Sequence, residues 1–168
     1  VMKKYINKEA YKKIKVGIIF GGRSAEHEVS LQSAKNVIAA LDIKKYSPII
    51  IFIDKKGLCE KKMDKLFSLS RGTFKKQLDV VFPVLHGTYG EDGTMQGLLK
   101  IMDVPFVGPS VLGSAVGMDK DIAKKLWQSA GIPVAKFLTF HVYEKNKINF
   151  SKIKKELGLP MFVKPVNM

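Results

Sequence analysis

The sequence predicts an α/β protein whose first domain is built on a parallel sheet. Short apolar runs typical of buried strands alternate, from Lys15 onward, with segments in which apolar residues recur at helical spacing. Glycine-rich loops follow the first and third of these runs, as expected where a parallel sheet offers a ligand site. A hydrophobic content of 46% over 168 residues is ample for a core.

The first predicted strand covers residues 15–20 and ends at a glycine pair. A helix follows, because apolar residues recur at helical spacing behind Ser30, which we place at the N-cap. This apolar stripe comprises Leu31, Ala34, Val37, Ile38 and Leu41. The next strand is expected at 46–53, and the turn 54–57 closes it.

The third predicted strand is the apolar run 79–85, and a loop that begins at His86 follows it. A helix is then expected at about 94–102. Its apolar stripe comprises Met95, Leu98, Leu99 and Met102. A short strand at 105–108 completes the first α/β domain, and we expect a domain boundary at 108–109.

Beyond this boundary an amphipathic helix is expected at 119–130, with Ile122, Leu126 and Trp127 on one side. A strand at 134–140, a helix at 150–157 and a strand at 161–164 follow. Because the last strand begins just before the chain ends, we expect the chain to be part of a longer enzyme.

The net charge of +14 is concentrated in lysine-rich segments. Segments 1–15 and 54–77 each carry +5, and 141–158 is also basic, whereas the segments that carry motifs are nearly balanced. Lysine dominates and aromatic residues are not interleaved, so a solvated basic surface explains the charge better than a nucleic-acid interface does. We therefore expect no nucleic-acid partner.

Cysteine usage and apolar run lengths indicate the compartment. Cys59 is the only cysteine, which excludes a disulfide framework and is typical of a reducing environment. The longest apolar runs, such as 49–53, are far too short to cross a bilayer, and lysines follow the first residues. We expect a cytoplasmic protein without a membrane partner.

The first glycine loop, residues 21–30, joins a strand to a helix and carries Glu26. It lacks the G-x-G-x-x-G spacing of dinucleotide sites, and the chain contains no G-x-x-x-x-G-K-[ST] phosphate loop. A carboxylate at this edge of a sheet is suited to hold a ligand ammonium group. On this loop alone, a helix-start acid favoured by the helix dipole explains Glu26 equally well.

The second glycine loop, residues 86–97, reads H-G-T-Y-G-E-D-G-T-M-Q-G and is interpreted as the floor of an active site. His86 emerges at a strand end, where it can donate to a substrate carboxylate or to developing charge. A single histidine also serves as a structural hydrogen-bonding group, but three nearby glycines indicate unusual backbone angles and favour function. Glu91 and Asp92 are interpreted as caps of the next helix, because no ligand cluster supports a metal site.

Two lysines differ from the surface lysines in their context. Lys120 follows Met118-Asp119, and Lys164 ends an apolar run and precedes Pro165. Each alone is explained as an ordinary lysine. Together, behind an α/β domain, they suggest a nucleotide polyphosphate held between two positive charges.

These motifs, in this order, resemble the N-terminal portion of the D-alanine:D-alanine ligase family, in the ATP-grasp superfamily. The matching stretches are 21–30, the whole loop 86–97, Val107-Gly108-Pro109-Ser110, Met118-Asp119-Lys120 and Val163-Lys164-Pro165. The 86–97 loop is the most specific match, and the resemblance covers residues 15–168. It implies a basic leader at 1–14, a Rossmann-like (pre-ATP-grasp) domain at 15–108 and the start of an α+β ATP-grasp domain at 109–168.

The resemblance implies ligation of two D-alanines for peptidoglycan synthesis, with ATP and Mg²⁺, through an acyl phosphate on the first D-alanine. Glu26 would bind the ammonium group of the first D-alanine and join a hydrogen-bond network, and His86 would contact its carboxylate. These two are the expected catalytic residues. Val29 would help to wall the pocket, and Lys120 and Lys164 would hold the ATP phosphates and the adenine side. A homodimer through the N-terminal domain is also implied.

Family members continue beyond Lys164-Pro165 into a glycine- and serine-rich loop, a mobile lid, acidic Mg²⁺ ligands and an arginine. We therefore expect no metal ligand in this chain and no ligase turnover by these 168 residues alone. Ligases that use D-lactate or D-serine as the second substrate share the same loops. A non-catalytic α/β binding or dimerisation module is the next alternative, and a nucleic-acid binder ranks third.

Overall fold

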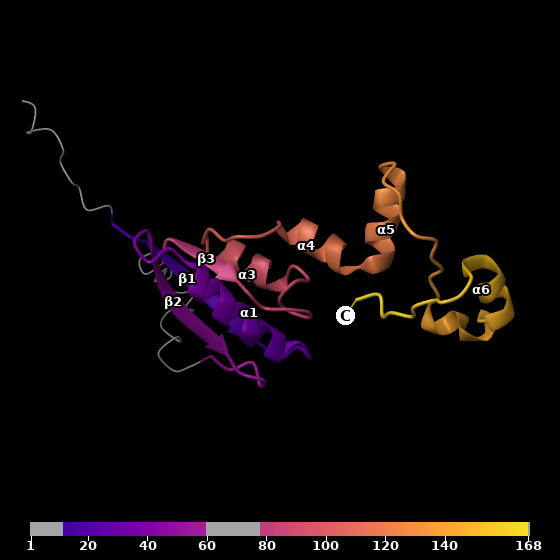
Figure 1. Ribbon diagram of the computed structural model, residues 1–168, viewed down its shortest axis with the longest axis horizontal. Coiled ribbons are helices and arrows are strands. Elements are labelled where there is room, and N and C mark those ends of the chain that lie inside the picture. Colours follow the sequence, from indigo (N-terminus) through magenta and orange to yellow (C-terminus); the bar gives the residue numbers. More distant parts are fainter. Residues whose placement is uncertain (1–11, 60–77, 168) are drawn as a thin grey trace, which may run out of the picture. The chain divides into compact units, whose positions relative to one another are not determined.

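The computed structural model describes residues 12–59 and 78–167. The chain divides into two compact units, Val1–Ser114 and Ala115–Met168 (Figure 1). Most of the expected leader and of the basic segment 58–78 lies outside the described residues. Each unit is treated by itself below, and the boundary expected at 108–109 stays a prediction.

The first unit is built on a parallel sheet with the strand order β2-β1-β3 (Figure 1). β1 is Ile14–Gly21, β2 is Tyr46–Ile53 and β3 is Val80–Pro83. Both neighbours pair with β1 in parallel, so the carboxyl ends of the strands meet at one edge of the sheet. The expected fourth strand is reduced to one parallel bridge between Val81 and Phe106. The α/β class and the first three predicted strands are confirmed.

Helices α1 (His27–Ala40) and α3 (Thr94–Ile101) cover opposite faces of this sheet. Successive strand residues point to opposite faces, and two apolar clusters result. The buried residues on the α1 side are Val16, Ile18, Ala34 and Val84. Those on the α3 side are Ile19, Ile51, Leu78, Val81, Leu85, Met95, Leu99 and Val104. The predicted apolar faces of both helices are therefore core faces.

The start of α1 corrects the expected N-cap. The helix begins at His27, so Ser30 lies in its first turn and is fully buried. The Ser30 hydroxyl accepts a hydrogen bond from the Gly21 N–H (2.8 Å) and donates one to the Val84 carbonyl (2.6 Å). Helical periodicity cannot reveal this role, because Gly21 ends β1 and Val84 follows β3, and only the folded sheet brings these two positions together.

The second unit contains helical elements joined by extended chain. α4 (Val111–Met118) runs across the division between the units, and α5 (Lys120–Ser129), the 3-10 helix η3 (Val142–Lys147) and α6 (Phe150–Leu157) follow. α5 and α6 confirm the predicted helices. α4 was missed because its two glycines and lack of charge obscure a helical pattern. No helix in the described ranges is long and apolar enough to span a bilayer.

The strands predicted at 134–140 and 161–164 are wrong, because the structure has extended chain without a strand ladder there. An apolar run becomes a strand only when another strand pairs with it, and no such pairing occurs among the described residues of this unit. Other bonds hold these segments. The Thr139 hydroxyl donates to Asp121 (2.7 Å), and the Lys120 N–H donates to the Val166 carbonyl (3.1 Å).

Candidate functional site

The first glycine loop leaves β1 through a tight reversal. Gly21 and Gly22 have φ values of 93° and 92°, and a Cβ at Gly21 would meet the backbone oxygen of Ile53. The buried imidazole of His27 then closes the loop, with its Nδ1 2.7 Å from the Gly22 carbonyl oxygen. This structural role of His27 was not expected from the sequence. The reversal leaves Glu26 exposed as the N-cap residue of α1.

The second glycine loop is shaped by its own two acids. Glu91 Oε2 accepts a hydrogen bond from the Gly87 N–H (2.7 Å). The Asp92 carboxylate accepts from the N–H groups of Tyr89 (2.8 Å) and Thr94 (3.0 Å). Burial raises the pKa of Asp92, but the hydrogen bonds from Thr94 and Tyr89 outweigh it and hold the pKa below its usual range.

The interpretation of both acids as caps of α3 is therefore half wrong. Asp92 does satisfy the Thr94 N–H at the start of the helix. Glu91 turns back into the loop, because the free N–H of Gly87 competes for its carboxylate. That choice leaves the other oxygen of Glu91 directed toward His86.

His86 lies between a hydroxyl and a carboxylate. Its Nε2 is 2.9 Å from the Ser33 hydroxyl oxygen, and its Nδ1 is 3.5 Å from Glu91 Oε1. The side chain is 30% exposed, so part of the ring remains accessible. Ser33 was not singled out from the sequence. The available signal was its position seven residues after Glu26, on the same face of the helix.

The two glycine loops meet at Gly87. A Cβ there would collide with the Glu26 carboxylate and the Ser24 hydroxyl, so Glu26 lies directly against the residue that follows His86. Val29 is half exposed one turn after Glu26 on α1. We call Glu26, Val29, Ser33 and His86 the Glu26–His86 patch. The structure thus places Glu26 beside the loop that begins at His86, and Val29 lies on the same helix as Glu26.

A mostly apolar hollow of about 250 Å³ lies beside this patch. Its lining includes Gly22, Arg23, Leu85, His86, Tyr89 and Leu98. Arg23 closes one side, because its Nε donates to the Lys56 carbonyl (2.8 Å) and its side chain covers Gly57. Glu28 on α1 forms an ion pair with Lys55 of the same turn (2.7 Å). The hydrogen bond from Lys55 lowers the pKa of Glu28. The turn after β2 is thereby fastened to the first loop.

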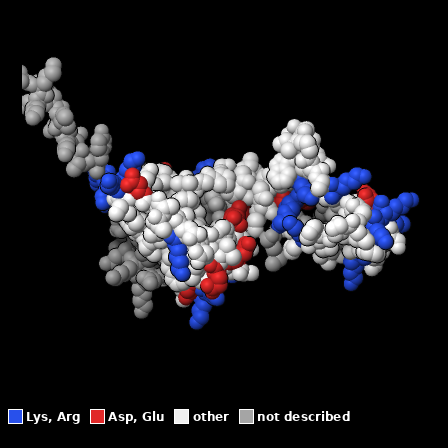
Figure 2. All heavy atoms as spheres, viewed as in Figure 1, with Lys and Arg blue, Asp and Glu red and all other residues white. Residues whose placement is uncertain are grey.

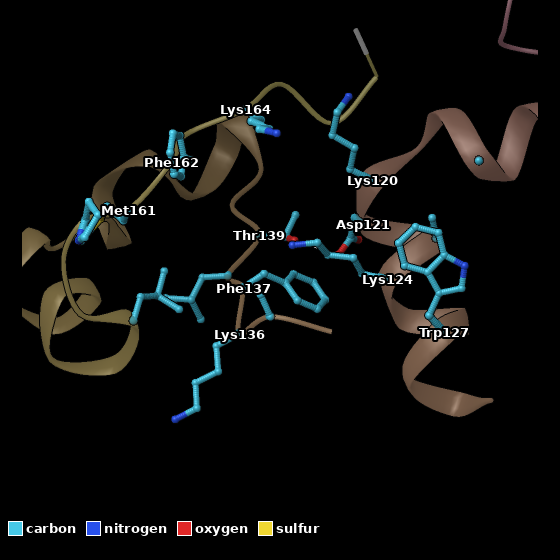
Figure 3. A pocket seen from close by; sticks show the side chains of 16 residues that line it. Lys120, Asp121, Lys124, Trp127, Lys136, Phe137, Thr139, Met161, Phe162 and Lys164 are labelled. Atoms are coloured by element: carbon cyan, nitrogen blue, oxygen red, sulfur yellow. The ribbon is translucent and has the colours of Figure 1, made fainter. Parts of the chain in front are cut away.

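A larger cavity, of about 760 Å³, lies within the second unit (Figure 3). Lys120 and Lys164 both line it, as do Lys124 and Lys136, which the sequence had not singled out. Its apolar lining includes Trp127, Phe137, Leu138, Met161 and Phe162. Cations beside aromatic and aliphatic walls form a site for a ligand that carries both an anionic and a flat apolar part.

Two of these lysines, Lys120 and Lys124, lie in the first turns of α5. Asp119 caps the helix by accepting from the N–H groups of Asp121 (3.1 Å) and Ile122 (2.9 Å). Lys120 Nζ donates to the Val166 carbonyl (3.3 Å). Lys124 Nζ lies 4.7 Å from the centre of the Phe137 ring.

Figure 2 shows lysine as the prevailing charged side chain on this unit, whereas the first unit displays both signs of charge.

Asp121, the acidic residue in the cavity lining, already has hydrogen-bond partners. Hydrogen bonds from Lys125 and from the Thr139 hydroxyl lower the pKa of Asp121. In the part of the chain that the structure describes, no group of three His, Cys, Asp or Glu side chains is placed to hold a metal ion. The cavity can therefore bind an anion through lysines, but no metal ligand is assigned in it.

Family models match most of the chain. A model described as "D-ala D-ala ligase N-terminus" matches residues 15–68 and 58–109. A second, described as "D-ala D-ala ligase C-terminus", matches residues 126–168. The first model alone covers more than half of the chain and contains both glycine loops.

Individual relatives agree with these models. The chain is 48% identical to a D-alanine–D-alanine ligase of Oceanobacillus iheyensis, over 92% of this chain and 51% of that relative. The VanG D-Ala:D-Ser ligase from Enterococcus faecalis has a TM-score of 0.73 and 36% identity, over 93% of this chain and 53% of its own. The Bacillus anthracis D-alanine–D-alanine ligase complexed with ATP has a TM-score of 0.64 and 34% identity, over 84% and 44%. This chain spans about half the length of its relatives.

Proposed function

This chain belongs to the D-alanine:D-alanine ligase family, and we propose that it carries the first amino-acid site and part of the nucleotide site of an ADP-forming ligase. In the proposed reaction a carboxylate oxygen of the first D-alanine attacks the terminal phosphorus of ATP, and ADP leaves. The amine of a second D-alanine then attacks the acyl carbon, and phosphate leaves. The product is D-alanyl-D-alanine, a building block of peptidoglycan.

One observation carries the proposal: the Glu26 carboxylate lies against Gly87, directly beside His86. A zwitterionic amino acid needs an anion for its ammonium group and a donor for its carboxylate, separated by the length of one small molecule. Glu26 supplies the anion, and His86 together with the Ser33 hydroxyl bonded to it supplies the donor. The exposed methyl groups of Val29, one helical turn from Glu26, supply an apolar wall for a methyl side chain.

For the nucleotide, we propose that the lysines of the second cavity hold the ATP phosphates. Lys120 and Lys164 line this cavity together with the aromatic rings of Trp127 and Phe137, which suit an adenine base. The Bacillus anthracis relative, whose solved structure is a complex with ATP, supports ATP as the nucleotide. Mg²⁺ enters the proposal through the family alone, and no described residue is assigned to it.

The second amino acid has two candidates. The curated relatives named D-alanine–D-alanine ligase favour D-alanine, whereas the VanG relative, a D-Ala:D-Ser ligase, supports D-serine. Both candidates use D-alanine as the first substrate, so the role of the Glu26–His86 patch is the same in either. We further propose that the protein acts in the cytoplasm, where ATP is available, as a homodimer through its first unit.

Titration of the chain with D-alanine, followed by NMR shifts of residues in the two glycine loops, tests the amino-acid site. We expect Glu26→Gln to weaken binding about tenfold, because the amide loses the charge that attracts the ammonium group. Glu28→Gln is the matched control, since Glu28 lies on the same helix but pairs with Lys55. Equal effects of the two changes, or saturating D-alanine without shifts in either loop, would contradict the proposed site.

A further inference from the structure

His86 has a polar neighbour at each of its ring nitrogens, and the two neighbours come from different elements. Ser33, on α1, is 2.9 Å from Nε2 although 53 residues separate the two in sequence. Glu91, in the loop before α3, is 3.5 Å from Nδ1. The second oxygen of Glu91 is occupied by the Gly87 N–H at 2.7 Å, so this carboxylate cannot turn away without losing that bond.

The chemistry of these neighbours selects one form of the neutral ring. An ionised carboxylate only accepts hydrogen bonds, so the 3.5 Å contact with Glu91 favours the form in which Nδ1 carries the proton. Nε2 is then the acceptor, and the Ser33 hydroxyl, which can donate or accept, donates to it. Without Ser33, Nε2 would face no donor, while the preference between the two forms would still rest on the contact with Glu91.

A carboxylate, an imidazole and a hydroxyl in this order also occur in serine hydrolases, but Ser33 is not placed as a nucleophile. It lies inside α1, where the backbone N–H groups bond to carbonyls of the preceding turn. Those groups are therefore not available to stabilise the oxyanion that would form on a substrate carbonyl attacked by Ser33. The arrangement is therefore suited to orient the ring and not to attack an acyl group.

We propose that Ser33 is a positioning residue that fixes the ring orientation of His86, while Glu91, at the opposite nitrogen, sets its tautomer. When the ring gains a proton, Nε2 becomes a donor and the Ser33 oxygen accepts from it. The Ser33 hydroxyl no longer donates to His86, and its O–H is then available to donate a hydrogen bond to a ligand carboxylate bound at the Glu26–His86 patch. This last consequence rests on the proposed amino-acid site, whereas the fixed tautomer does not.

Long-range ¹H–¹⁵N NMR of the ligand-free chain at alkaline pH, where imidazole is neutral, reads the tautomer directly. The chain has three histidines, and the signal lost in His86→Gln identifies the relevant ring. We expect a single Nδ1–H form in the unchanged chain. Ser33→Thr should retain this form and the ¹⁵N shift of Nε2. Ser33→Val, which has the shape of Thr without a hydroxyl, and Ser33→Ala should keep the Nδ1–H form but change the Nε2 shift, because the hydrogen bond at that nitrogen is lost. Glu91→Gln should lose the single form, because an amide can donate as well as accept.

The control is Gln32→Ala, because the neighbouring Gln32 is exposed and its side chain bonds to Asn36 on the same helix. An Nε2 shift that is unchanged in both Ser33→Val and Ser33→Ala, or that changes in Ser33→Thr, overturns the role of Ser33, and a single Nδ1–H form that persists in Glu91→Gln overturns the role of Glu91. The Thr and Val pair keeps the test valid if Ser33→Ala fails to fold.

D-alanine titration separates this inference from the proposed function. If both hold, Ser33→Val should also weaken D-alanine binding about tenfold, as expected for one hydrogen bond to a charged group, and Ser33→Thr should restore it. An Nε2 shift that changes in Ser33→Val, in a chain that does not bind D-alanine, supports the inference and removes the proposed function. D-alanine binding with an Nε2 shift that is unchanged in Ser33→Val does the reverse.

Discussion

The absence of a side chain at Gly87 leaves room for the Glu26 carboxylate above the second loop. Gly87 also has a φ of 70°, in the left-handed region that a residue with a Cβ rarely adopts. The sequence indicated that glycines around His86 permit unusual backbone angles. It did not indicate that Gly87 makes the contact between the two loops, because Glu26 is 61 positions away in the chain.

Gly87→Ala should therefore damage both the fold and the patch. We expect a loss of about 1–3 kcal/mol in the free energy of unfolding, from the strained backbone and the displaced carboxylate. D-alanine binding should fall with it, because Glu26 can no longer lie beside His86. Denaturant unfolding and the NMR titration measure the two effects, and unchanged binding would contradict the contact between the loops.

Gly97→Ala is the matched control at the same scale. Gly97 lies inside α3, and a Cβ added there meets nothing within 4 Å. Alanine is favoured over glycine in a helix by about 0.5–1 kcal/mol, so this variant should be as stable as the original chain or more so. Its D-alanine titration should be unchanged.

At the scale of elements, Asp121 joins α5 to the extended segment that contains Thr139. Hydrogen bonds from Lys125 and Thr139 lower the pKa of Asp121 in the folded chain. The stabilisation from a lowered carboxyl pKa is complete above the ordinary aspartate pKa of about 4 and is lost as the pH falls through the lower folded value. This junction should therefore weaken below about pH 4.

We expect Asp121→Asn to remove that part of the acid dependence, because the amide does not titrate. Amide chemical shifts of Thr139 followed through acidification measure it. Asp42→Asn is the control, since Asp42 bonds to the Lys44 N–H in the other unit. An acid response of Thr139 that is the same in Asp121→Asn and in the unchanged chain would show that another group controls the junction.

Elements were predictable where local pattern and tertiary environment agree. The strand at 46–53 and the helix at 150–157 have the predicted bounds, because their periodicity and their turn or cap residues are local. The runs 134–140 and 161–164 look equally apolar, yet they are not strands. Strand formation depends on a pairing partner, and an apolar run carries no information about whether one is present.

At the scale of the whole molecule, we expect the chain to bind ATP in the cavity of the second unit even when no D-alanine is present. Trp127 is the only tryptophan and lines the cavity, so ATP should quench its fluorescence. Lys164→Ala should weaken the response about tenfold, since it removes one charge facing the phosphates. Lys152→Ala, on α6 and outside the cavity lining, should not. Equal responses of the two variants would contradict the proposed phosphate position.

Association of two chains is the other prediction at this scale. A homodimer through the first unit should appear in sedimentation or light scattering as a concentration-dependent doubling of mass. The net charge of +14 makes salt a necessary variable, since repulsion between chains weakens as ions screen it. A monomer at every concentration, at both low and moderate salt, would contradict the proposed dimer.

Strand and helix periodicity, the glycine loops and the order of the motifs could all be interpreted from the chain, because each depends on residues close together in sequence. The family, Glu26, His86 and the two lysines followed from them. Ser33 beside His86, Glu91 turned back to Gly87 and the absent second-unit strands could not be derived in this way. These features depend on which distant groups meet after folding, and a hydroxyl, carboxylate or apolar run carries no local sign of its eventual partner.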